Sequence, residues 1–496
     1  MPTMKVSVID LGYNSLKLVN YIVKPDKSFA AYSQRSVLAR IGDGLDETGF
    51  LKDEAILRTI KALKLFQEVA KFEGSEKVLP VATSAVREAG NRDQFLQQAY
   101  KETGFAFKVL SQREEALCSY SGASNSTNAP SGLFFDLGGG SLEMVLASNF
   151  KPKRILSVPL GGLRLTDLYA KNSGKFTKKN YSRMSERIQE LLPNEKDLKG
   201  LKKPDLVGVG GSVRTLARYH QMLTNYPLDK LHNYSLKDSW VELMHNYLQR
   251  LKLKEIENIP VIGQERARSI IAGSLVVERL MKALGFDRLI VSTHGLRDGV
   301  LAAYLQNPSA YNKGPIEDIL AQIENHKAPG LSEDSADAIR TFASRNLVTR
   351  REEALVVYGV SETLSDEPPM DPETLFYLII NSDSVLTHTN QVMMALAVVR
   401  AKGLRRAEWL YDKYQDILGK NARETIARVS AILHLVEVLE KTHARLQNST
   451  QKGNELFIRI IPGKPPFPSN LFNTVVKDME NAFGIKMQYS LSTGGH

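Results

Sequence analysis

The stretches IDLGYNSLKLV (residues 9–19) and FDLGGGSLEMV (residues 135–145) are two copies of one pattern. Each copy has an apolar run, then Asp-Leu-Gly-x-x-Ser, then a second apolar run. Glycine permits a tight turn, so each copy predicts a β-hairpin whose loop brings backbone amides close to one another. Amides grouped in this way bind anions, and an aspartate at a strand end can hold a divalent cation. Two matched loops therefore predict a clamp for a phosphate and a metal ion.

A third glycine loop follows in LVGVGGSVR (residues 206–214). Gly210, Gly211 and Ser212 stand between an apolar strand and the expected start of a helix. Amides at a helix N-terminus also favour phosphate. Actin-like ATPases, sugar kinases and chaperone ATPases carry three loops in this order, so the pattern favours that class of fold.

The composition is that of a globular protein with several domains. The chain has 496 residues, of which 43% are hydrophobic and 24% are charged. A single cysteine, Cys118, excludes a disulfide framework and a cysteine-based zinc cluster. The formal net charge of +10 favours an anionic partner. No apolar run approaches the roughly 20 residues that span a bilayer, and no targeting segment is visible, so we expect a cytoplasmic protein without membrane contact.

The order of the expected elements predicts the domain organisation. Strands and helices alternate as far as about residue 312, which favours an α/β architecture. The chain then becomes almost entirely helical, and its end has a strand–helix–strand pattern. We expect two actin-like (ribonuclease H-like) domains that enclose a cleft, at residues 1–125 and 126–312, an all-helical domain at residues 313–447, and a small α+β segment at residues 448–496.

Several further motifs occur in a fixed order around the three loops. They are ATSAVREA (residues 82–89), EEA (114–116), PLGGLRL (159–165), ERA (265–267) and GLRDGV (295–300). With these motifs the sequence closely resembles the exopolyphosphatase / guanosine pentaphosphate phosphohydrolase family from about Val6 to Tyr304. The resemblance implies a hydrolase that acts on phosphoanhydrides.

The resemblance also implies a catalytic set. Glu115 matches the catalytic glutamate of the family, where it acts as general base, and we prefer it to the neighbouring Glu114. Without the resemblance, either glutamate would be interpreted as a solvated carboxylate on a helix surface. Asp10, Asp136 and Glu143 are the candidate ligands of Mg²⁺ or Mn²⁺, and Glu143 is alternatively a residue that positions water.

The candidate phosphate-binding residues come from the three loops and from nearby cations. They are Gly12, Asn14, Ser15, Lys17, Arg87, Gly138, Gly139, Gly140, Ser141, Gly210, Gly211, Ser212 and Arg266. Two positions depart from the family pattern. Tyr13 replaces a small residue and is expected to narrow the phosphate pocket. Lys17 replaces an arginine, which keeps the charge but loses the bidentate geometry.

The expected function is Mg²⁺-dependent release of terminal phosphate from inorganic polyphosphate. Guanosine pentaphosphate is the alternative substrate, since both activities use the same loops, and a non-catalytic sensor of polyphosphate or nucleotide is a further alternative. No specific nucleic acid is expected as a partner. The helical region has no His-Asp dipeptide, so we expect it to serve in structure, in polymer binding or in the contacts of a homodimer rather than as a second active site.

Overall fold

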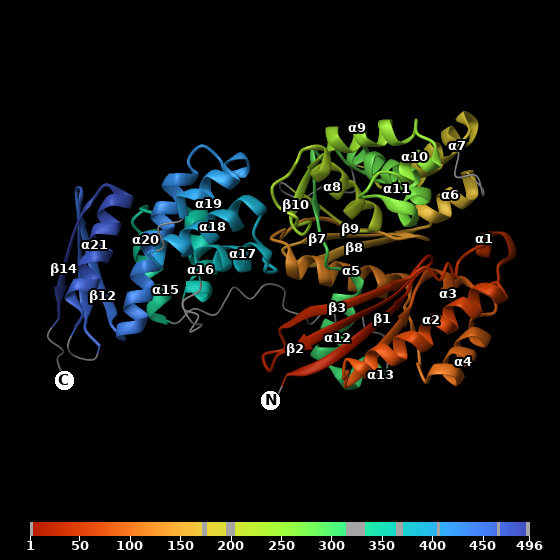
Figure 1. Ribbon diagram of the computed structural model, residues 1–496, viewed down its shortest axis with the longest axis horizontal. Coiled ribbons are helices and arrows are strands. Elements are labelled where there is room, and N and C mark those ends of the chain that lie inside the picture. The colour runs from red at the N-terminus through yellow and green to blue at the C-terminus, as the bar shows by residue number, and fades with distance from the viewer. Residues whose placement is uncertain are drawn as a thin grey trace. The chain divides into compact units, whose positions relative to one another are not determined.

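The computed structural model describes residues 3–170, 176–194, 204–313, 333–363, 371–403, 407–463 and 467–492. The chain divides into two compact units, Met1–Asn325 and His326–His496. The first unit contains two mixed β-sheets with helices packed on them, and the second is mainly helical (Figure 1). The division of the first unit into α/β halves follows from the two copies of the glycine-loop hairpin.

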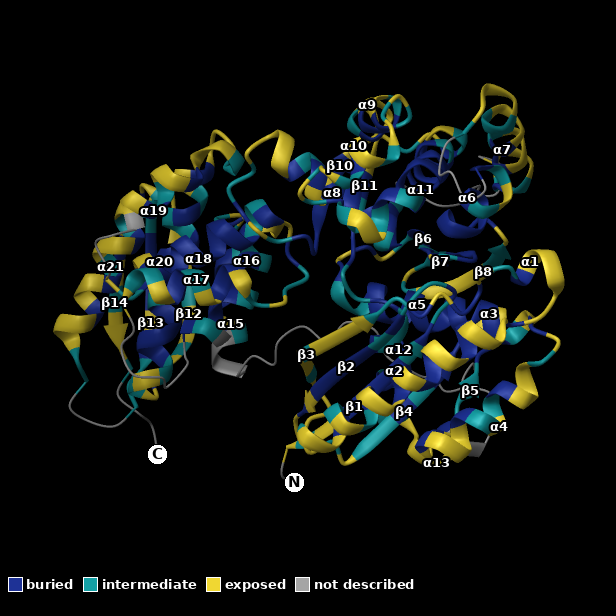
Figure 2. Cartoon of the chain, turned by 45° about the vertical axis from the view of Figure 1, so that its right-hand side comes forward, coloured by how far each residue is buried: buried dark blue, intermediate teal, exposed yellow. Residues whose placement is uncertain are grey.

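The first sheet has the strand order β3-β2-β1-β4-β5. Its strands are β1 (Met4–Leu11), β2 (Leu16–Val23), β3 (Phe29–Val37), β4 (Lys77–Ala82) and β5 (Lys108–Val109). Strands β1, β2 and β3 are antiparallel neighbours, whereas β4 runs parallel to β1. The helices that accompany this sheet are α1 (Leu45–Thr48), α2 (Asp53–Phe72), α3 (Ser84–Glu88) and α4 (Arg92–Thr103). The interiors of β1 and β2 are almost wholly buried, whereas β3 at the sheet edge is largely exposed (Figure 2). Burial accounts for the mainly apolar sequences of β1 and β2.

The second sheet repeats this topology and has the order β10-β11-β9-β6-β7-β8. Its strands are β6 (Gly132–Leu137), β7 (Leu142–Ser148), β8 (Lys151–Val158), β9 (Asp205–Gly210), β10 (Tyr234–Lys237) and β11 (Arg288–Val291). Taken from β8 to β11, the order matches that of the first sheet from β3 to β5, and β10 is an addition. Its helices are α6 (Gly162–Ala170), α7 (Lys178–Leu191), α8 (Gly211–Leu223), α9 (Asp238–Leu248), α10 (Leu253–Glu257) and α11 (Gly263–Leu284). The sequence repeat thus extends to the connectivity of a whole sheet.

Two helices join the halves of the first unit. Helix α5 (Gln112–Ser126) leads from the first sheet into the second, and α12 (Leu296–Gln306) packs along α5 and against β1. The contact is close because Gly299 has no side chain: a Cβ there would lie 2.0 Å from the carbonyl oxygen of Cys118. Helix α13 (Pro308–Lys313) follows α12, and Tyr311 shares a core cluster with β1 residues. The chain therefore returns to the first sheet after completing the second.

The second unit packs its helices around α20 (Ala422–Thr442). The other helices are α15 (Glu333–Ala343), α16 (Arg350–Thr363), α17 (Pro372–Asn381), α18 (His388–Ala401), α19 (Ala407–Tyr414), the 3-10 turn η3 (Gln415–Ile417) and α21 (Ser469–Phe483). A small sheet has the order β12-β13-β14, from β12 (Arg445–Lys452), β13 (Glu455–Ile461) and β14 (Lys486–Leu491). The largely polar β12 was not predicted as a strand. Among the described residues, no helix is long and apolar enough to cross a membrane.

Candidate active site

The two glycine loops have the same local geometry. In the first hairpin Asp10 pairs with Lys17, and the amide of Gly12 donates to the carbonyl of Ser15 over 3.1 Å. In the second, Asp136 pairs with Glu143, and the amide of Gly138 donates to Ser141 over 3.0 Å. We call residues 12–15 the first phosphate loop and residues 138–141 the second. The structure brings them together: a Cβ on Gly139 would lie 3.4 Å from the Cβ of Asn14.

The third glycine loop connects β9 to α8. Gly210 ends the strand with φ +113°, a value that a side chain would strain, and α8 begins at Gly211. A Cβ on Gly211 would lie 2.4 Å from Cζ of Arg266, so the Arg266 guanidinium lies across this loop. Ser212 is buried, and its hydroxyl faces Gly273, where a Cβ would lie 2.2 Å from the Ser212 Oγ. The predicted third loop thus forms a helix N-terminus with a cation laid against it.

Glu115 lies in the first turn of α5 and forms an ion pair with Arg87 at the end of α3. Arg87 Nη1 donates to Glu115 Oε2 over 2.7 Å and to the carbonyl of Leu110 over 2.8 Å. The Glu115 side chain is only 11% exposed. Burial raises the pKa of Glu115 to about 7, against the opposite effect of Arg87 and with support from Asp136 and Asp10. A carboxyl poised near neutral pH suits a general base.

Glu114 has a structural role instead. Its Oε2 accepts a hydrogen bond from the amide of Ser111 over 2.8 Å, while the Ser111 hydroxyl accepts from the Glu114 amide over 3.1 Å. This is a capping box that begins α5. The geometry therefore supports Glu115 over Glu114 as the chemically active glutamate.

The remaining candidate carboxylates lie around Glu115. Asp136 accepts a hydrogen bond from the Ser119 hydroxyl over 2.6 Å, and Glu143 accepts one from the Ser157 hydroxyl over 3.1 Å. Burial raises the pKa of Asp136. Burial, and after it the charge of Glu115, raises the pKa of Glu143 well above its ordinary value. These carboxylates repel one another inside the protein, and a cation among them would relieve that repulsion.

The donor set fits magnesium in one particular way. The described residues contain no group of three or more His, Cys, Asp or Glu side chains placed to hold a metal ion by themselves. Magnesium needs no such cage, because it usually keeps several waters and binds one or two carboxylates together with substrate phosphate. Carboxylates such as Asp136 and Glu143 supply the hard oxygen donors that it prefers. The chain thus fits a cation shared with substrate.

A pocket of about 710 Å³ opens beside the third glycine loop, and most of its charged lining residues are cations. We call it the basic pocket, and its positively charged side chains are Lys17, Arg35, Arg214, Arg218, Arg266 and Arg297. Glu265 is the one acidic side chain among its lining residues, and none of those residues is aromatic. Arg35 and Arg218 are exposed, whereas the other four cations are partly buried. The pocket therefore presents a path of positive charge from exposed Arg35 and Arg218 to Lys17 of the first hairpin and to the third glycine loop.

The inner cations of the basic pocket are crowded. Burial, followed by repulsion from Arg297, lowers the pKa of Lys17 to about 7, although Asp10 opposes this shift. Burial and the same neighbour lower the pKa of Arg214 to about 10, and burial lowers that of Arg266. Crowded positive charges of this kind cost free energy in the free protein, and a polyvalent anion would offset that cost.

The structure adds residues that the sequence analysis did not single out. Arg214 and Arg297 lie in the first turns of α8 and α12, and Ser119 lies on α5. The sequence signal for Arg214 and Arg297 was their position at the start of a helix next to a glycine motif. Their proximity to each other depends on the tertiary structure and not on either motif. Arg87 gains support as a phosphate ligand, because its Nε and Nη2 are buried without a hydrogen-bond partner among the described residues. Tyr13 is buried beside the second loop, where a Cβ on Gly140 would lie 2.6 Å from its ring.

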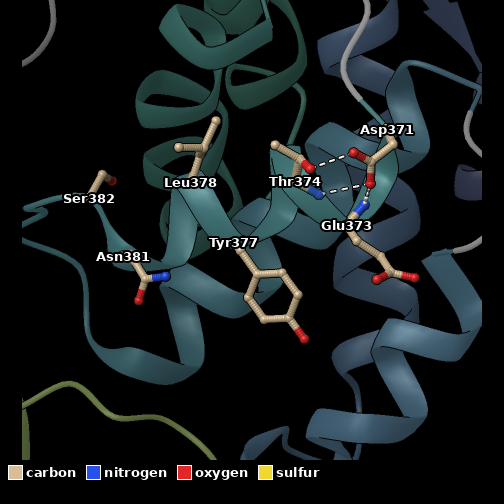
Figure 3. Close-up of a pocket in the computed structure, with 7 residues that line it drawn as sticks. All are labelled: Asp371, Glu373, Thr374, Tyr377, Leu378, Asn381 and Ser382. Carbon is tan, nitrogen blue, oxygen red and sulfur yellow. Dashed lines mark hydrogen bonds between the residues drawn. The ribbon is translucent and has the colours of Figure 1, made fainter.

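A second pocket lies on α17 in the other unit and contains none of the candidate residues (Figure 3). Asp371 caps this helix: its Oδ1 accepts from the amides of Glu373 and Thr374, both over 3.0 Å. The Asp371 carboxylate also accepts from the Thr374 hydroxyl. The polar groups at this end of the pocket are therefore explained by helix capping.

The two matched hairpins, the third loop and the duplicated sheet define the actin-like class of phosphate-binding folds. Comparison with known proteins then identifies the family. The model of the Ppx/GppA phosphatase family matches residues 22–307, more than half of the chain, and the protein belongs to this family. Residues 308–496 lie outside that match.

Three relatives show how far the similarity extends. Exopolyphosphatase 2 of Mycobacterium tuberculosis is 30% identical over 317 residues, which cover 60% of this chain and 98% of that protein. The bifunctional 3-dehydroquinate synthase/phosphatase of Fusobacterium nucleatum is 27% identical over 309 residues, 60% of this chain but only 46% of that protein. The chain thus spans about half the length of this relative. The crystal structure of the Aquifex aeolicus Ppx/GppA family member is 29% identical with a TM-score of 0.52, and the alignment covers 62% of this chain and all of that one.

Proposed function

We propose that this protein is an exopolyphosphatase that releases orthophosphate from the end of inorganic polyphosphate. The observation that carries this proposal is the basic pocket, whose lining includes Lys17 of the first hairpin and Gly211 of the third glycine loop. A long polyanion gains from every phosphate that such a path neutralises, and by analogy with nucleic acids it also gains from released counterions. The exopolyphosphatase name of the mycobacterial relative agrees with this substrate class.

The proposed reaction places the terminal phosphate between the first and second phosphate loops. Glu115 takes a proton from a water molecule, whose oxygen attacks the terminal phosphorus. The bond between that phosphorus and the bridging oxygen breaks, orthophosphate forms, and the bridging oxygen stays on the shortened chain with a negative charge. Arg87 orients Glu115 through the 2.7 Å ion pair, and its Nε and Nη2 are two further donor nitrogens for the transferred phosphate. Lys17 and Arg214 stabilise the charge on the leaving chain.

We further propose that Mg²⁺ or Mn²⁺ is required. Asp136 and Glu143 would hold the ion, with Asp10 as a further oxygen donor from the opposite hairpin. Once bound, the ion would supply positive charge near the phosphate oxygens. The raised pKa values of Asp136 and Glu143, caused first by burial, support this assignment, because a cation favours the ionised carboxylates.

The lining of the basic pocket favours a plain phosphate chain over a nucleotide. Nucleotide sites commonly stack the base on an aromatic ring. The residues that line this pocket include no aromatic side chain. We therefore propose inorganic polyphosphate, rather than guanosine pentaphosphate, as the preferred substrate.

The deciding experiment is a phosphate-release assay on long polyphosphate, tripolyphosphate, guanosine pentaphosphate and ATP. Each substrate is measured with Mg²⁺, with Mn²⁺ and with a chelator, and the Glu115→Gln variant serves as the background control. We expect the highest kcat/KM on long polyphosphate and no release with chelator. Faster hydrolysis of guanosine pentaphosphate would contradict the proposed substrate. Equal release from the wild type and the Glu115→Gln variant would contradict the proposed mechanism.

A further inference from the structure

Four side chains from both halves of the first unit meet behind the phosphate loops. Arg164 on α6 donates from Nε to Asp46 Oδ2 over 3.1 Å and from Nη2 to Glu88 Oε2 over 2.6 Å. The Tyr13 hydroxyl donates to the same Asp46 oxygen over 2.9 Å. The Arg164 guanidinium carbon lies 5.3 Å from the centre of the Tyr13 ring. We call these four residues the loop clamp.

The loop clamp is connected to both phosphate loops through the backbone. Tyr13 belongs to the first loop, and its carbonyl accepts from the Gly42 amide over 3.0 Å. The Arg164 amide donates to the carbonyl of Gly139 in the second loop over 2.9 Å, and the Leu163 amide donates to the same oxygen over 3.1 Å. Arg164 thus bonds to the first half through its side chain and to the second phosphate loop through its backbone amide.

The clamp also adjoins the catalytic pair. Glu88, which accepts from Arg164, directly follows Arg87 in α3, and Arg87 holds Glu115. A shift of Arg164 would therefore move both the second phosphate loop and the end of α3. A displacement of about 1 Å at a reacting group can cost on the order of a hundredfold in rate.

The burial of the clamp indicates a role in geometry. The Arg164 side chain is 4% exposed, whereas those of Asp46 and Glu88 are 28% and 37% exposed. A buried charge of this kind adds little net stability because desolvation offsets the attraction, but its directional bonds fix how the parts are arranged. Burial, with the nearby Asp46 charge, raises the pKa of Tyr13, so its hydroxyl remains a neutral donor.

We propose that Arg164 is a positioning residue that sets the separation of the two phosphate loops across the junction between the halves of the first unit. Its Nε and Nη2 bond to two separate carboxylates at once from a planar, rigid group, a geometry that a lysine ammonium cannot reproduce. Tyr13 covers the guanidinium and shares Asp46 with it, which gives this departure from the family pattern a function. This inference rests on the proposed function for its kinetic part, but its geometric part does not depend on activity.

The test measures loop separation and kinetics in the same variants. Spin labels are attached to cysteines introduced at Lys61 on α2 and Glu242 on α9, both exposed, while the native Cys118 is fully buried. Distances between the labels are recorded for the wild type, Arg164→Met and Arg164→Lys. The matched control is Arg268→Lys. Arg268 on α11 forms an ion pair over 3.2 Å with Asp167, which lies on α6 as Arg164 does, but both partners belong to the second half of the unit.

We expect a longer or broader distance distribution in both Arg164 variants and no change in the control. With tripolyphosphate and long polyphosphate, kcat/KM should fall at least tenfold in both variants, mainly through kcat, while the control stays within twofold of the wild type. If Arg164→Met does not fold, Arg164→Lys alone decides the question, because it keeps the charge and most of the volume.

An unchanged distance distribution in the folded variants would overturn the inference whatever the kinetics show. A changed distribution with unchanged kcat/KM would overturn the positioning role. If the wild type releases no phosphate from any polyphosphate, the proposed function fails, and the inference about loop separation is then judged by the distance measurement alone.

Discussion

Replacing Glu115 by glutamine tests the proposed chemistry most directly. The amide has nearly the shape of the carboxylate and still offers an oxygen to Arg87 Nη1, which lies 2.7 Å from Glu115 Oε2 in the wild type. It cannot take a proton from water. The loss of a positioned general base lowers turnover by about 10²–10⁴-fold. Since the phosphate loops and the basic pocket are untouched, KM for polyphosphate should change little.

The pH dependence of kcat/KM is a second test of Glu115 as the general base. Burial raises the pKa of Glu115 to about 7 in the free protein, although Arg87 opposes the shift. The protonated carboxyl cannot act as a base. The wild-type kcat/KM should therefore rise about tenfold per pH unit below that value. Above it kcat/KM should fall, because Lys17, whose pKa burial lowers to about 7, loses its charge. Glu115→Gln should lack the acidic limb.

Glu114→Gln is the matched control for this experiment. Glutamine can replace glutamate in a capping box, so α5 should keep its N-terminal cap. We expect turnover within about twofold of the wild type, with an unchanged pH profile, because side-chain changes away from the reacting groups usually have small effects. Loss of activity in Glu114→Gln together with normal turnover in Glu115→Gln would refute the assignment of the base.

Three further predictions concern the cation, the substrate chain and acid stability. Asp136→Asn should lower Mg²⁺-dependent turnover more than Asp10→Asn, because Asp136 shares its hairpin with another carboxylate; equal, mild losses in a Mg²⁺ titration would place the ion elsewhere. Arg35→Ala combined with Arg218→Ala should raise KM for long polyphosphate but not for tripolyphosphate, and should reduce the log–log salt slope by roughly one per removed cation; a salt series on both substrates would expose a uniform effect, which would contradict this assignment. Burial lowers the pKa of His245 from 6.5 to about 4, so the folded state favours the neutral ring and stability is lost as pH falls below 6.5. Between pH 7 and pH 5 the His245 contribution should be about 2 kcal/mol, and the change in the free energy of urea unfolding over that range should differ by this amount between the wild type and His245→Gln.

The phosphate loops were predictable because their geometry is local. Asp-Leu-Gly-x-x-Ser determines both the turn and the register, so that Asp10 faces Lys17 and Asp136 faces Glu143 across their hairpins. The same reasoning predicted that the loops would share a site, because duplicated units that use the same strand ends place them in corresponding positions. The strand order of the two sheets agrees with that expectation.

The basic pocket and the loop clamp were not predictable in the same way. Arg214 and Arg297 come from helices far apart in sequence, and nothing in either segment indicates that the two guanidinium groups become neighbours. Tyr13 was expected to narrow the phosphate pocket. Beyond that expectation, its ring lies against Gly42 and Gly140, and its hydroxyl donates to Asp46. The packing of α12 against the first sheet was not predictable for the same reason. It depends on the close tertiary contact at Gly299 and not on a local sequence signal.

The two hairpins differ in one charged residue, and this difference makes the two sides of the proposed phosphate site chemically unlike. The residue opposite the aspartate that both hairpins contain is a lysine in the first hairpin and a glutamate in the second. Lys17 joins the arginines of the basic pocket, whereas Glu143 joins the carboxylates around Glu115. Hydrolysis of a phosphate chain needs this asymmetry, because water must lose a proton on one side of the phosphorus while negative charge develops on the leaving chain at the other. Exchange of the two residues, as Lys17→Glu with Glu143→Lys, would keep the net charge but place the carboxylate where the leaving chain lies. We therefore expect the double variant to fold and to lose activity on every chain length. Retained activity would show that the two hairpins are chemically equivalent.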